Sequence, residues 1–342
     1  MNRRVFLGLM FGTLLAGTLT PARSIQPAKA RTIVVPDNYP TIQEAINNAN
    51  EGDTVFVRNG TYYENVVVNR AIRLAGECWE NTTIDGRREH AVGYAITVIA
   101  SNVLVSGFTV QNWSNGIYGS TTGTTYQQNL IRDNGFGFNL HDCANNNLSD
   151  NIFIDNYFGS LISSSSEHIT IRRDTFTDNV RNLGAGMGDD AGISSTLAYD
   201  IDDSNTVNGK PIYYLVNARN FKVPTNAGFV AAINSSDVTI EGLDLANNGI
   251  GVLLIRSSNC YIANVNATDN DDCGISLRAR HNRGFFCIVG LSWRSNSGLD
   301  EKGSSETEET ACSVSARVLS YFLLLIISVK CQTTHSTRLC HR

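Results

Sequence analysis

Short apolar runs, some of them alternating with polar residues, recur along the middle of the chain. Clear examples are Val103-Leu104-Val105, Val238-Thr239-Ile240 and Val252-Leu253-Leu254, and all three lie close to Asn, Asp, Ser or Gly. Short β-branched runs between tight-turn residues are typical of β-strands, whereas helices need longer runs with apolar positions three and four apart. The pattern therefore predicts many short strands joined by tight corners.

These strands belong to a repeat of about 22 residues that is marked by asparagine. A glycine often follows the asparagine after three or four positions, as at Gly116, Gly137, Gly159, Gly251 and Gly274. The asparagines in this phase are Asn112, Asn134, Asn156, Asn179, Asn226, Asn248 and Asn270. A fixed period of roughly 20–50 residues indicates a stacked-repeat architecture. A unit of this length accommodates one coil of a parallel β-helix, an all-β solenoid with a single strand per face.

Asparagine suits the corners of such a coil. It tolerates left-handed backbone angles, and its amide can donate to one neighbouring coil and accept from the other, as in stacked cross-β ladders. We therefore interpret the recurring asparagines as structural, together with the Asp-Asn pairs that contain them. The solenoid is predicted to cover residues 31–277, with an insertion at about 184–225 where the pattern blurs.

The first coil carries a predicted lid. Ile42, Ala45 and Ile46 fall on one helical face, and Thr41 with Glu44 has the spacing of a capping box, which predicts a helix over about 41–49. Such a helix would cover the open end of the stack. At the other end the repeat stops, and residues 278–342 form an atypical tail that we interpret as degenerate or frame-shifted.

Residues 1–30 have the form of an export signal. Arg3 and Arg4 precede an apolar stretch, and Ala28-Lys29-Ala30 has the form of a cleavage site. Export would place the protein in the periplasm, outside the cell or at its surface, and both general export routes stay open. Residues 318–329 are apolar but shorter than the ~20 residues that span a membrane, so no span is predicted after signal removal.

Charge narrows the range of partners. The net charge is −5 and no basic stripe is present, which argues against nucleic acid as a partner. An elongated monomer that contacts polysaccharide or other cell-surface components fits this composition better.

Three segments carry a family resemblance. Residues 32–76, 208–216 and 227–255 resemble NosD-like proteins, which are exported right-handed parallel β-helices with carbohydrate-binding and sugar-hydrolase repeats. The family name implies copper delivery. Copper prefers clustered His, Met or Cys ligands, whereas the six histidines here are scattered and Met187 is the one methionine beyond the signal. Copper handling thus rests on the resemblance alone.

An enzyme is the main alternative to a binding protein. Asp271 and Asp272 resemble the paired aspartates of polygalacturonases. The acid expected one coil earlier is missing, because Asn247-Asn248-Gly249 stands there. The pair is a weak catalytic candidate for a divergent polysaccharide lyase or glycoside hydrolase.

The favoured hypothesis is an exported, non-catalytic β-helix that binds glycans or surface components. Aromatic side chains on an outer face would stack on sugar rings, and the candidates are Trp113, Tyr157, Phe158, Tyr213 and Tyr214. The insertion adds a set of carboxylates whose hard oxygens suit Ca²⁺, namely Asp189, Asp190, Asp200, Asp202 and Asp203.

Overall fold

The structure is a computed structural model of the chain. It describes residues 29–87, 92–163, 165–184, 199–245, 248–268, 270–271 and 274–278, and the backbone alone of residues 185, 273, 285–292, 314–317, 323–330 and 339–340.

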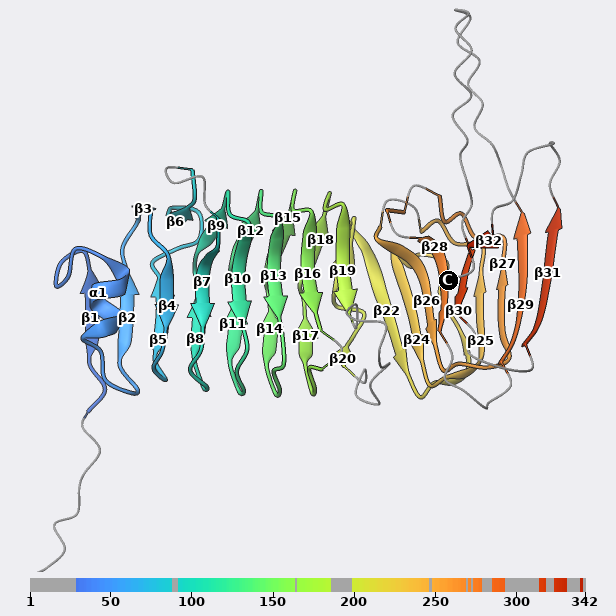
Figure 1. Cartoon of the computed structure of the whole chain (residues 1–342), viewed down its shortest axis with the longest axis horizontal. Coiled ribbons are helices and arrows are strands. Elements are labelled where there is room, and N and C mark those ends of the chain that lie inside the picture. The colour runs from blue at the N-terminus through green and yellow to red at the C-terminus, as the bar shows by residue number, and fades with distance from the viewer. Residues whose placement is uncertain are drawn as a thin grey trace, which may run out of the picture.

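The first part of the molecule is a regular stack of parallel coils, each of which adds one strand to each of three sheets (Figure 1). The eight-stranded sheet contains β1 (Thr32–Val35), β2 (Thr54–Val57), β5 (Arg73–Gly76), β8 (Leu104–Ser106), β11 (Thr125–Gln127), β14 (Asn147–Ser149), β17 (Thr170–Arg172) and β20 (Asp200–Ile201). The six-stranded sheet contains β4 (Val66–Val68), β7 (Tyr94–Val98), β10 (Asn115–Gly119), β13 (Phe136–Leu140), β16 (Phe158–Ile162) and β19 (Arg181–Ala185).

The thirteen-stranded sheet runs through both parts of the molecule. Its first strands are β3 (Gly60–Tyr62), β6 (Thr82–Asp85), β9 (Thr109–Gln111), β12 (Leu130–Arg132), β15 (Ile152–Ile154), β18 (Thr175–Thr177) and β21 (Thr206–Val207). An antiparallel hairpin at Asn208-Gly209 then joins β21 to β22, where the second part begins. The sheet continues through β22 (Lys210–Val216), β24 (Phe229–Ile233), β26 (Ile250–Ile255), β28 (Cys273–Arg278), β30 (Val314–Arg317) and β32 (Leu339–Cys340).

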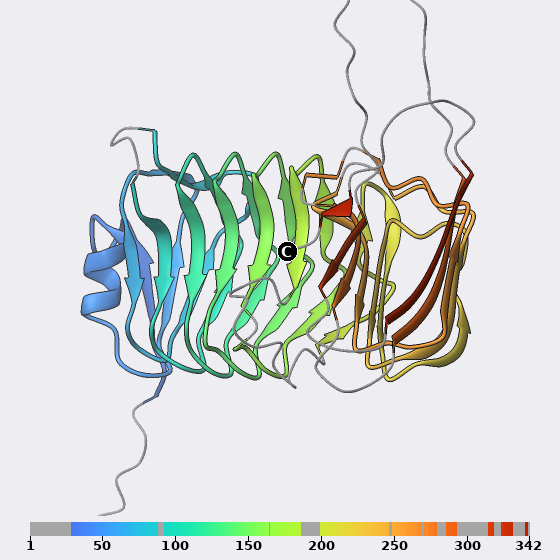
Figure 2. The same cartoon turned by 45° about the vertical axis from the view of Figure 1, so that its right-hand side comes forward.

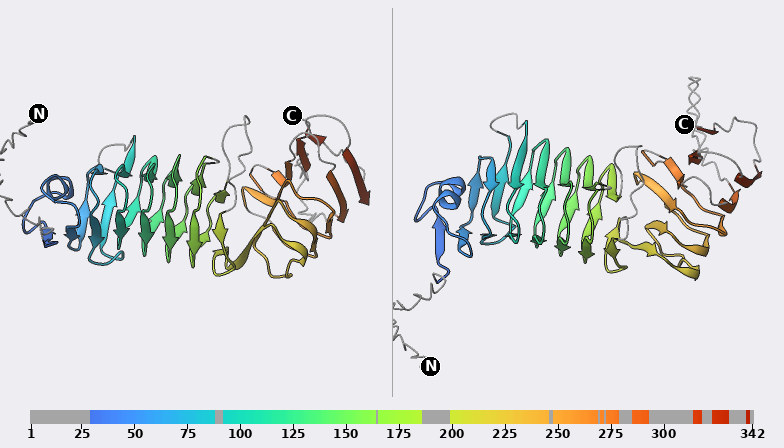
Figure 3. Two further views of the ribbon diagram at one scale, coloured as in Figure 1. Left: turned by 90° about the horizontal axis from the view of Figure 1, so that it is seen from below. Right: turned by 60° about the horizontal axis from the view of Figure 1, so that its bottom comes forward.

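Coils of the second part alternate between that sheet and a five-stranded one (Figures 2 and 3). The five-stranded sheet contains β23 (Arg219–Lys222), β25 (Ser236–Glu241), β27 (Cys260–Ala263), β29 (Phe285–Ser292) and β31 (Leu323–Lys330). Strand pairing thus extends beyond residue 277, where the repeat ends in the sequence.

The predicted lid is present at the N-terminal end of the stack. Helix α1 (Ile42–Asn47) starts at Thr41, whose side-chain oxygen accepts a hydrogen bond from the Glu44 N–H. The carboxylate of Glu64 accepts from the N–H groups of Ile42 and Gln43, which have no partner inside the helix. The apolar face of α1 is buried against the first coil.

The asparagine ladder is confirmed. At the corner between the thirteen- and six-stranded sheets, Asn134 donates from its backbone N–H and its amide to Asn156 Oδ1, at 3.1 Å in each case. Asn156 donates in the same way to Asn179 Oδ1, and Asn248 donates to Asn270 Oδ1 at 2.8 Å. The repeat in the sequence is therefore a repeat of buried hydrogen bonds.

Two asparagines of the predicted series lie outside the ladder. Asn112 has a left-handed backbone (φ 63°) and corresponds to Asp133, so Trp113 occupies the ladder position beneath Asn134. Asn226 is exposed in the loop before β24. Both were placed by spacing, which does not distinguish neighbouring corner positions.

The glycines of the repeat allow adjacent coils to touch. A Cβ atom on Gly116, Gly137 or Gly159 would lie 2.4–2.6 Å from a carbonyl oxygen of the next coil. Inside the coils, buried aromatic side chains stack on one another, and the ring centroids of Phe153 and Phe176 are 4.6 Å apart. The interior is thus filled by side chains, and any ligand-binding surface lies outside the coils.

Candidate functional site

An outward-facing row of side chains crosses the six-stranded sheet. Strand pairing aligns Tyr94, Asn115, Phe136, Phe158 and Arg181, one on each successive coil. These positions point outward, because each strand turns its buried side chains toward the core. With neighbouring strands about 4.8 Å apart, five coils make a row roughly 19 Å long.

Aromatic rings dominate this face. The rings of Phe136 and Phe158 stack with centroids 4.7 Å apart and planes within 4°. The Tyr157 ring packs edge-on against the Phe158 ring, with centroids 5.2 Å apart. The ring centroids of Tyr94 and Tyr118 are 4.8 Å apart. Tyr94 and Tyr157 are exposed, and the other three rings are half-buried. We call these five residues the aromatic strip.

An ion pair closes one end of the aromatic strip. The central carbon of the Arg181 guanidinium, Cζ, lies 4.9 Å from the centroid of the Phe158 ring and 5.9 Å from that of the Tyr157 ring. Arg181 pairs with Asp271 of the second part, which also accepts a hydrogen bond from the Tyr157 hydroxyl at 3.4 Å. The contact between the two parts of the molecule thus positions a cation over the aromatic strip.

The edge of the aromatic strip is acidic. Asp133, Asp155 and Asp178 occupy the same left-handed corner position on successive coils, and all three side chains are exposed. Each lies three residues before a member of the outward row. The surface therefore combines apolar ring faces with carboxylate acceptors. The Arg181 charge is balanced by Asp271, and Asp133 pairs with Arg132 at 3.6 Å.

Only part of the predicted aromatic set lies on this face. Tyr157 and Phe158 belong to the aromatic strip. Trp113 is a core residue, because the ladder position it occupies points inward. Tyr214 is also buried, on the inward face of β22, where its ring stacks on Tyr199 at 6.2 Å. Tyr213 is half-buried on β22, with its ring 6.4 Å from that of Phe221.

The predicted carboxylate sites are occupied by arginine where the structure describes them. Asp200 and Asp202 both pair with Arg172, with N–O distances of 2.5 and 3.0 Å, and Asp203 is exposed. Asp189, Asp190 and Asp272 lie outside the described residues. Among the residues that are described, no three His, Cys, Asp or Glu side chains come together to hold a metal ion.

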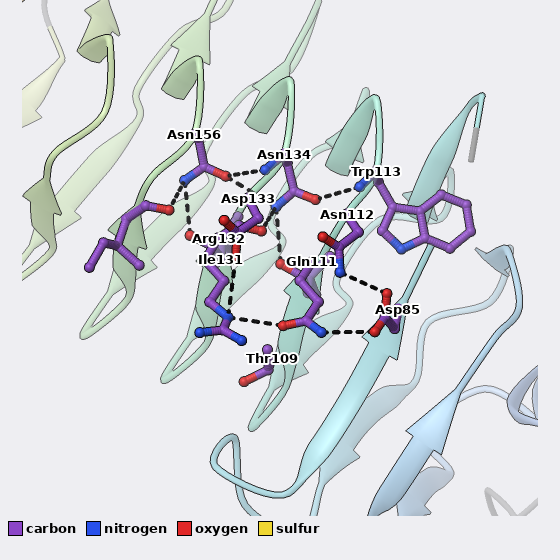
Figure 4. A network of polar contacts seen from close by, with 12 residues as sticks. Asp85, Thr109, Gln111, Asn112, Trp113, Ile131, Arg132, Asp133, Asn134 and Asn156 are labelled. Carbon is purple, nitrogen blue, oxygen red and sulfur yellow. Dashed lines mark hydrogen bonds and ion pairs between the residues drawn. The ribbon is translucent and has the colours of Figure 1, made fainter. Parts of the chain in front are cut away.

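A polar network lies on the outer face of the neighbouring thirteen-stranded sheet (Figure 4). Asp85 accepts hydrogen bonds from Gln111 at 2.9 Å and from Asn112 at 2.8 Å, and Arg132 donates to the Gln111 oxygen at 2.9 Å. Burial raises the pKa of Asp85, but the bonds from Gln111 and Asn112 outweigh it, so that the pKa lies below its ordinary value. Asp85 is therefore a fixed anion that serves structure and is unsuited to donate a proton.

Sequence reasoning missed Tyr94, Tyr118, Phe136 and Arg181. The spacing of 22 between Phe136 and Phe158 equals the period of the ladder, because both lie two residues after a ladder asparagine. Comparing the residues that lie two positions after each ladder asparagine would have revealed the outward-facing row. Arg181 occupies the same position one coil later.

Comparison with known proteins supports the architecture. The family described as "Right handed beta helix region" matches residues 25–176. The fold is a right-handed parallel β-helix. A cell surface glycoprotein of Methanothermus fervidus is 30% identical over 111 residues, which cover 31% of this chain and 18% of that protein. The chain thus matches less than a fifth of this relative's length.

Two solved structures also match the chain, at low similarity. The mannuronan C-5 epimerase A-module of Azotobacter vinelandii has a TM-score of 0.43 and 14% identity, covering 85% of this chain and 95% of its own. The pectin methylesterase of Aspergillus niger has a TM-score of 0.41 and 14% identity, covering 88% and 93%. Within the described part of this β-helix, no helix is long and apolar enough to cross a membrane.

Proposed function

We propose that this β-helix is an exported, NosD-like protein of the cell surface that binds polysaccharide without turning it over. The observation that carries the proposal is the aromatic strip on the outer face of the six-stranded sheet. Solvent-exposed aromatic clusters on a rigid face are unusual unless something binds to them. The sequence likeness to a cell surface glycoprotein and the export signal predicted over residues 1–30 support the location.

The geometry of the aromatic strip suits a chain-like ligand. Ring faces at adjacent coils present a flat apolar surface on which the C–H faces of sugar rings can stack, and the row is long enough for several sugars. The side-chain amide of Asn139 faces outward beside the rings and has no hydrogen-bond partner among the described residues. It can therefore bond to sugar hydroxyls.

The acidic edge indicates the class of polysaccharide. Asp155 and Asp178 would repel a polyuronate, whereas they can accept hydrogen bonds from the hydroxyl groups of a neutral glycan. Asp133 adds less to this repulsion, because its carboxylate lies 3.6 Å from the Arg132 guanidinium. We therefore propose neutral polysaccharides as the ligand class.

A binding experiment tests this function. The full chain is applied to a polysaccharide array, and hits are measured by calorimetry for the parent protein and a Phe136→Ala/Phe158→Ala double variant. Each lost aromatic stack contributes about 1 kcal/mol, so we expect affinity to fall by roughly tenfold or more. Tyr261→Ala is the matched control, since Tyr261 is an exposed aromatic on the five-stranded sheet.

Two outcomes would contradict the proposal. One is a protein that binds no polysaccharide on the array. The other is an affinity that the double variant leaves unchanged. Release of reducing ends from a bound polysaccharide would instead favour the hydrolase or lyase alternative.

A further inference from the structure

A pocket of about 260 Å³ opens on the corner between the eight- and thirteen-stranded sheets. Trp79 and Glu80 lie on one side of it, Gln128 on the other, and Ser106 and Gly107 at the corner between them. The aromatic strip lies on the six-stranded sheet, so the pocket is a separate feature of the surface.

The pocket exists because one corner position lacks a side chain. Strand pairing aligns Gly107 with Gln128, Asp150 and Arg173 on the next three coils, and all four residues have positive φ. The later coils fill this position with long or charged side chains. Gly107 leaves it open, and a Cβ on Gly76 of the preceding coil would lie 2.2 Å from the Gly107 carbonyl oxygen.

The loop that carries Trp79 is held in place by hydrogen bonds to neighbouring segments. Five residues, 77–81, connect β5 to β6, whereas Gly107 and Phe108 alone connect β8 to β9. The Trp79 carbonyl accepts a hydrogen bond from the Thr109 hydroxyl at 2.6 Å, and Glu77 accepts from the Asn59 N–H at 2.9 Å. The loop that carries the half-buried Trp79 is thus tied to both neighbouring segments.

Several polar side chains that line the pocket are unpaired among the described residues. In the described part of the chain, no hydrogen bond engages the Trp79 indole N–H, the Glu80 carboxylate, the Ser106 hydroxyl or the Gln128 amide. No Lys or Arg lines the pocket. The neighbouring Arg58 is bound by both oxygens of Asp37. The pocket is therefore negatively charged and rich in unused donors and acceptors.

We propose that this pocket binds a small hydroxylated ligand that carries a protonated amine, of the amino-sugar class. Ser106 and Gln128 bond to its hydroxyl groups, Glu80 pairs with its ammonium group, and the Trp79 ring stacks on its apolar face. An ammonium ion is also attracted to an indole face. This site does not depend on polysaccharide binding at the aromatic strip.

Tryptophan fluorescence of the full chain tests the site, with glucosamine, glucose and glucuronate as probes. We expect glucosamine to give a saturable change at millimolar concentrations, glucose a weaker one, and glucuronate none. In a Trp293→Phe background, which removes the third tryptophan of the chain, the Trp79→Phe variant should lose the change, because Trp113 is buried away from the pocket. Equal binding of the three sugars, or no saturable change with any of them, would overturn the proposal.

Two variants separate the charge from the shape. Glu80→Gln should weaken glucosamine binding about tenfold, the loss expected for one charge-assisted contact, and leave glucose binding unchanged. Ser106→Gln should abolish both by filling the pocket. The fold should tolerate this substitution, because the aligned position of the next coil, Gln127, already carries glutamine. Binding that survives Ser106→Gln in a folded protein would contradict the site.

A control keeps this proposal distinct from the polysaccharide-binding function. The Phe136→Ala/Phe158→Ala variant should bind glucosamine as the parent does. Loss of glucosamine binding in that variant would show that the two surfaces are one site.

Discussion

The Asn182 amide donates a hydrogen bond to the side-chain oxygen of Asn248, 66 residues further along the chain, at 2.9 Å. Asn182 itself accepts from the Asn179 amide at 3.0 Å. Both residues of the long-range pair are buried. The bond therefore carries the asparagine ladder of the first part into the second part, across the interruption of the coils.

Asn182→Ala tests this junction. It leaves the Asn179 amide and the Asn248 oxygen each short of one buried partner, and each such loss costs roughly 1–3 kcal/mol. We expect the free energy of unfolding to fall by about 3 kcal/mol in urea denaturation. Hydrogen exchange should rise in β26 and remain unchanged in β10, because stability in a solenoid is transmitted between neighbouring coils.

Asn226→Ala is the matched control for Asn182→Ala. Asn226 has the phase of the asparagine repeat but is exposed, so its loss should change stability by less than about 0.5 kcal/mol. Equal effects of the two substitutions would contradict the role of the Asn182–Asn248 bond.

Gly137→Ala tests the close contact between coils. The added Cβ would lie 2.4 Å from the Gly159 carbonyl oxygen, so the two coils must separate. Overpacking of this kind costs roughly 1–3 kcal/mol, which should lower the midpoint of urea denaturation. Gly60→Ala is the comparison, because the nearest atom there is a Tyr62 side-chain carbon at 3.4 Å. If both variants were equally stable, the contact would have no energetic role.

The sequence predicted the fold well because one physical constraint recurs in every coil. A buried corner amide must find partners above and below, and this forces asparagine at a spacing of one coil, as at Asn134 and Asn156. The same spacing misplaced Asn112 and Asn226, since it does not record whether a side chain points inward. Backbone angle and burial decide that, and both are local properties of each corner.

The functional surface was less visible in the sequence. Phe136 and Phe158 repeat with the ladder and could have been found by their phase. The pair between Arg181 and Asp271 joins residues 90 apart. It depends on how the second part lies against the first, which no local period encodes.

Asp271→Asn tests the end of the aromatic strip. Without the ion pair, the Arg181 guanidinium is no longer held over the Phe158 ring, and we expect polysaccharide affinity to fall several-fold in calorimetry. Stability should fall by less than about 1 kcal/mol, because such partly exposed pairs contribute little. Glu241→Gln, which breaks the pair with Lys222 on the five-stranded sheet, should leave binding unchanged. If Asp271→Asn abolished reducing-end release from a bound polysaccharide, Asp271 would be catalytic.

Asp174 occupies an asparagine position in a second ladder, at the corner between the eight- and thirteen-stranded sheets. Its Oδ1 accepts from the Asn151 N–H at 2.8 Å and from the Asn151 amide at 3.1 Å, and its own N–H donates to Asn205. The other oxygen, Oδ2, is buried without a partner. Burial raises the pKa of Asp174 from its ordinary value of 3.8 to about 8, so the side chain is a neutral acid at pH 7.

This shift makes stability depend on pH in a defined direction. Between pH 4 and 8 the folded protein retains a proton on Asp174 that the unfolded chain has lost, so stability falls as pH rises through that window. The slope is at most about 1.4 kcal/mol per pH unit. Asp174→Asn places a side-chain amide at this ladder position. Amides suit such positions, because Asn151 and Asn205, its neighbours in the ladder, each donate a side-chain hydrogen bond to a main-chain carbonyl. We expect the variant to lose the slope and to be more stable than the parent at pH 8.

Urea denaturation of the parent and the variant between pH 5 and pH 9 measures this difference. Asp37→Asn is the control, because the hydrogen bonds from Arg58 hold the pKa of Asp37 below its ordinary value, so that it stays ionised across this range. The control should therefore keep the parent's slope, at a slightly lower stability, since it loses an exposed ion pair. If Asp174→Asn declined with pH in parallel with the parent, some other group would be taking up the proton, and the ladder would accommodate a carboxylate as readily as an amide.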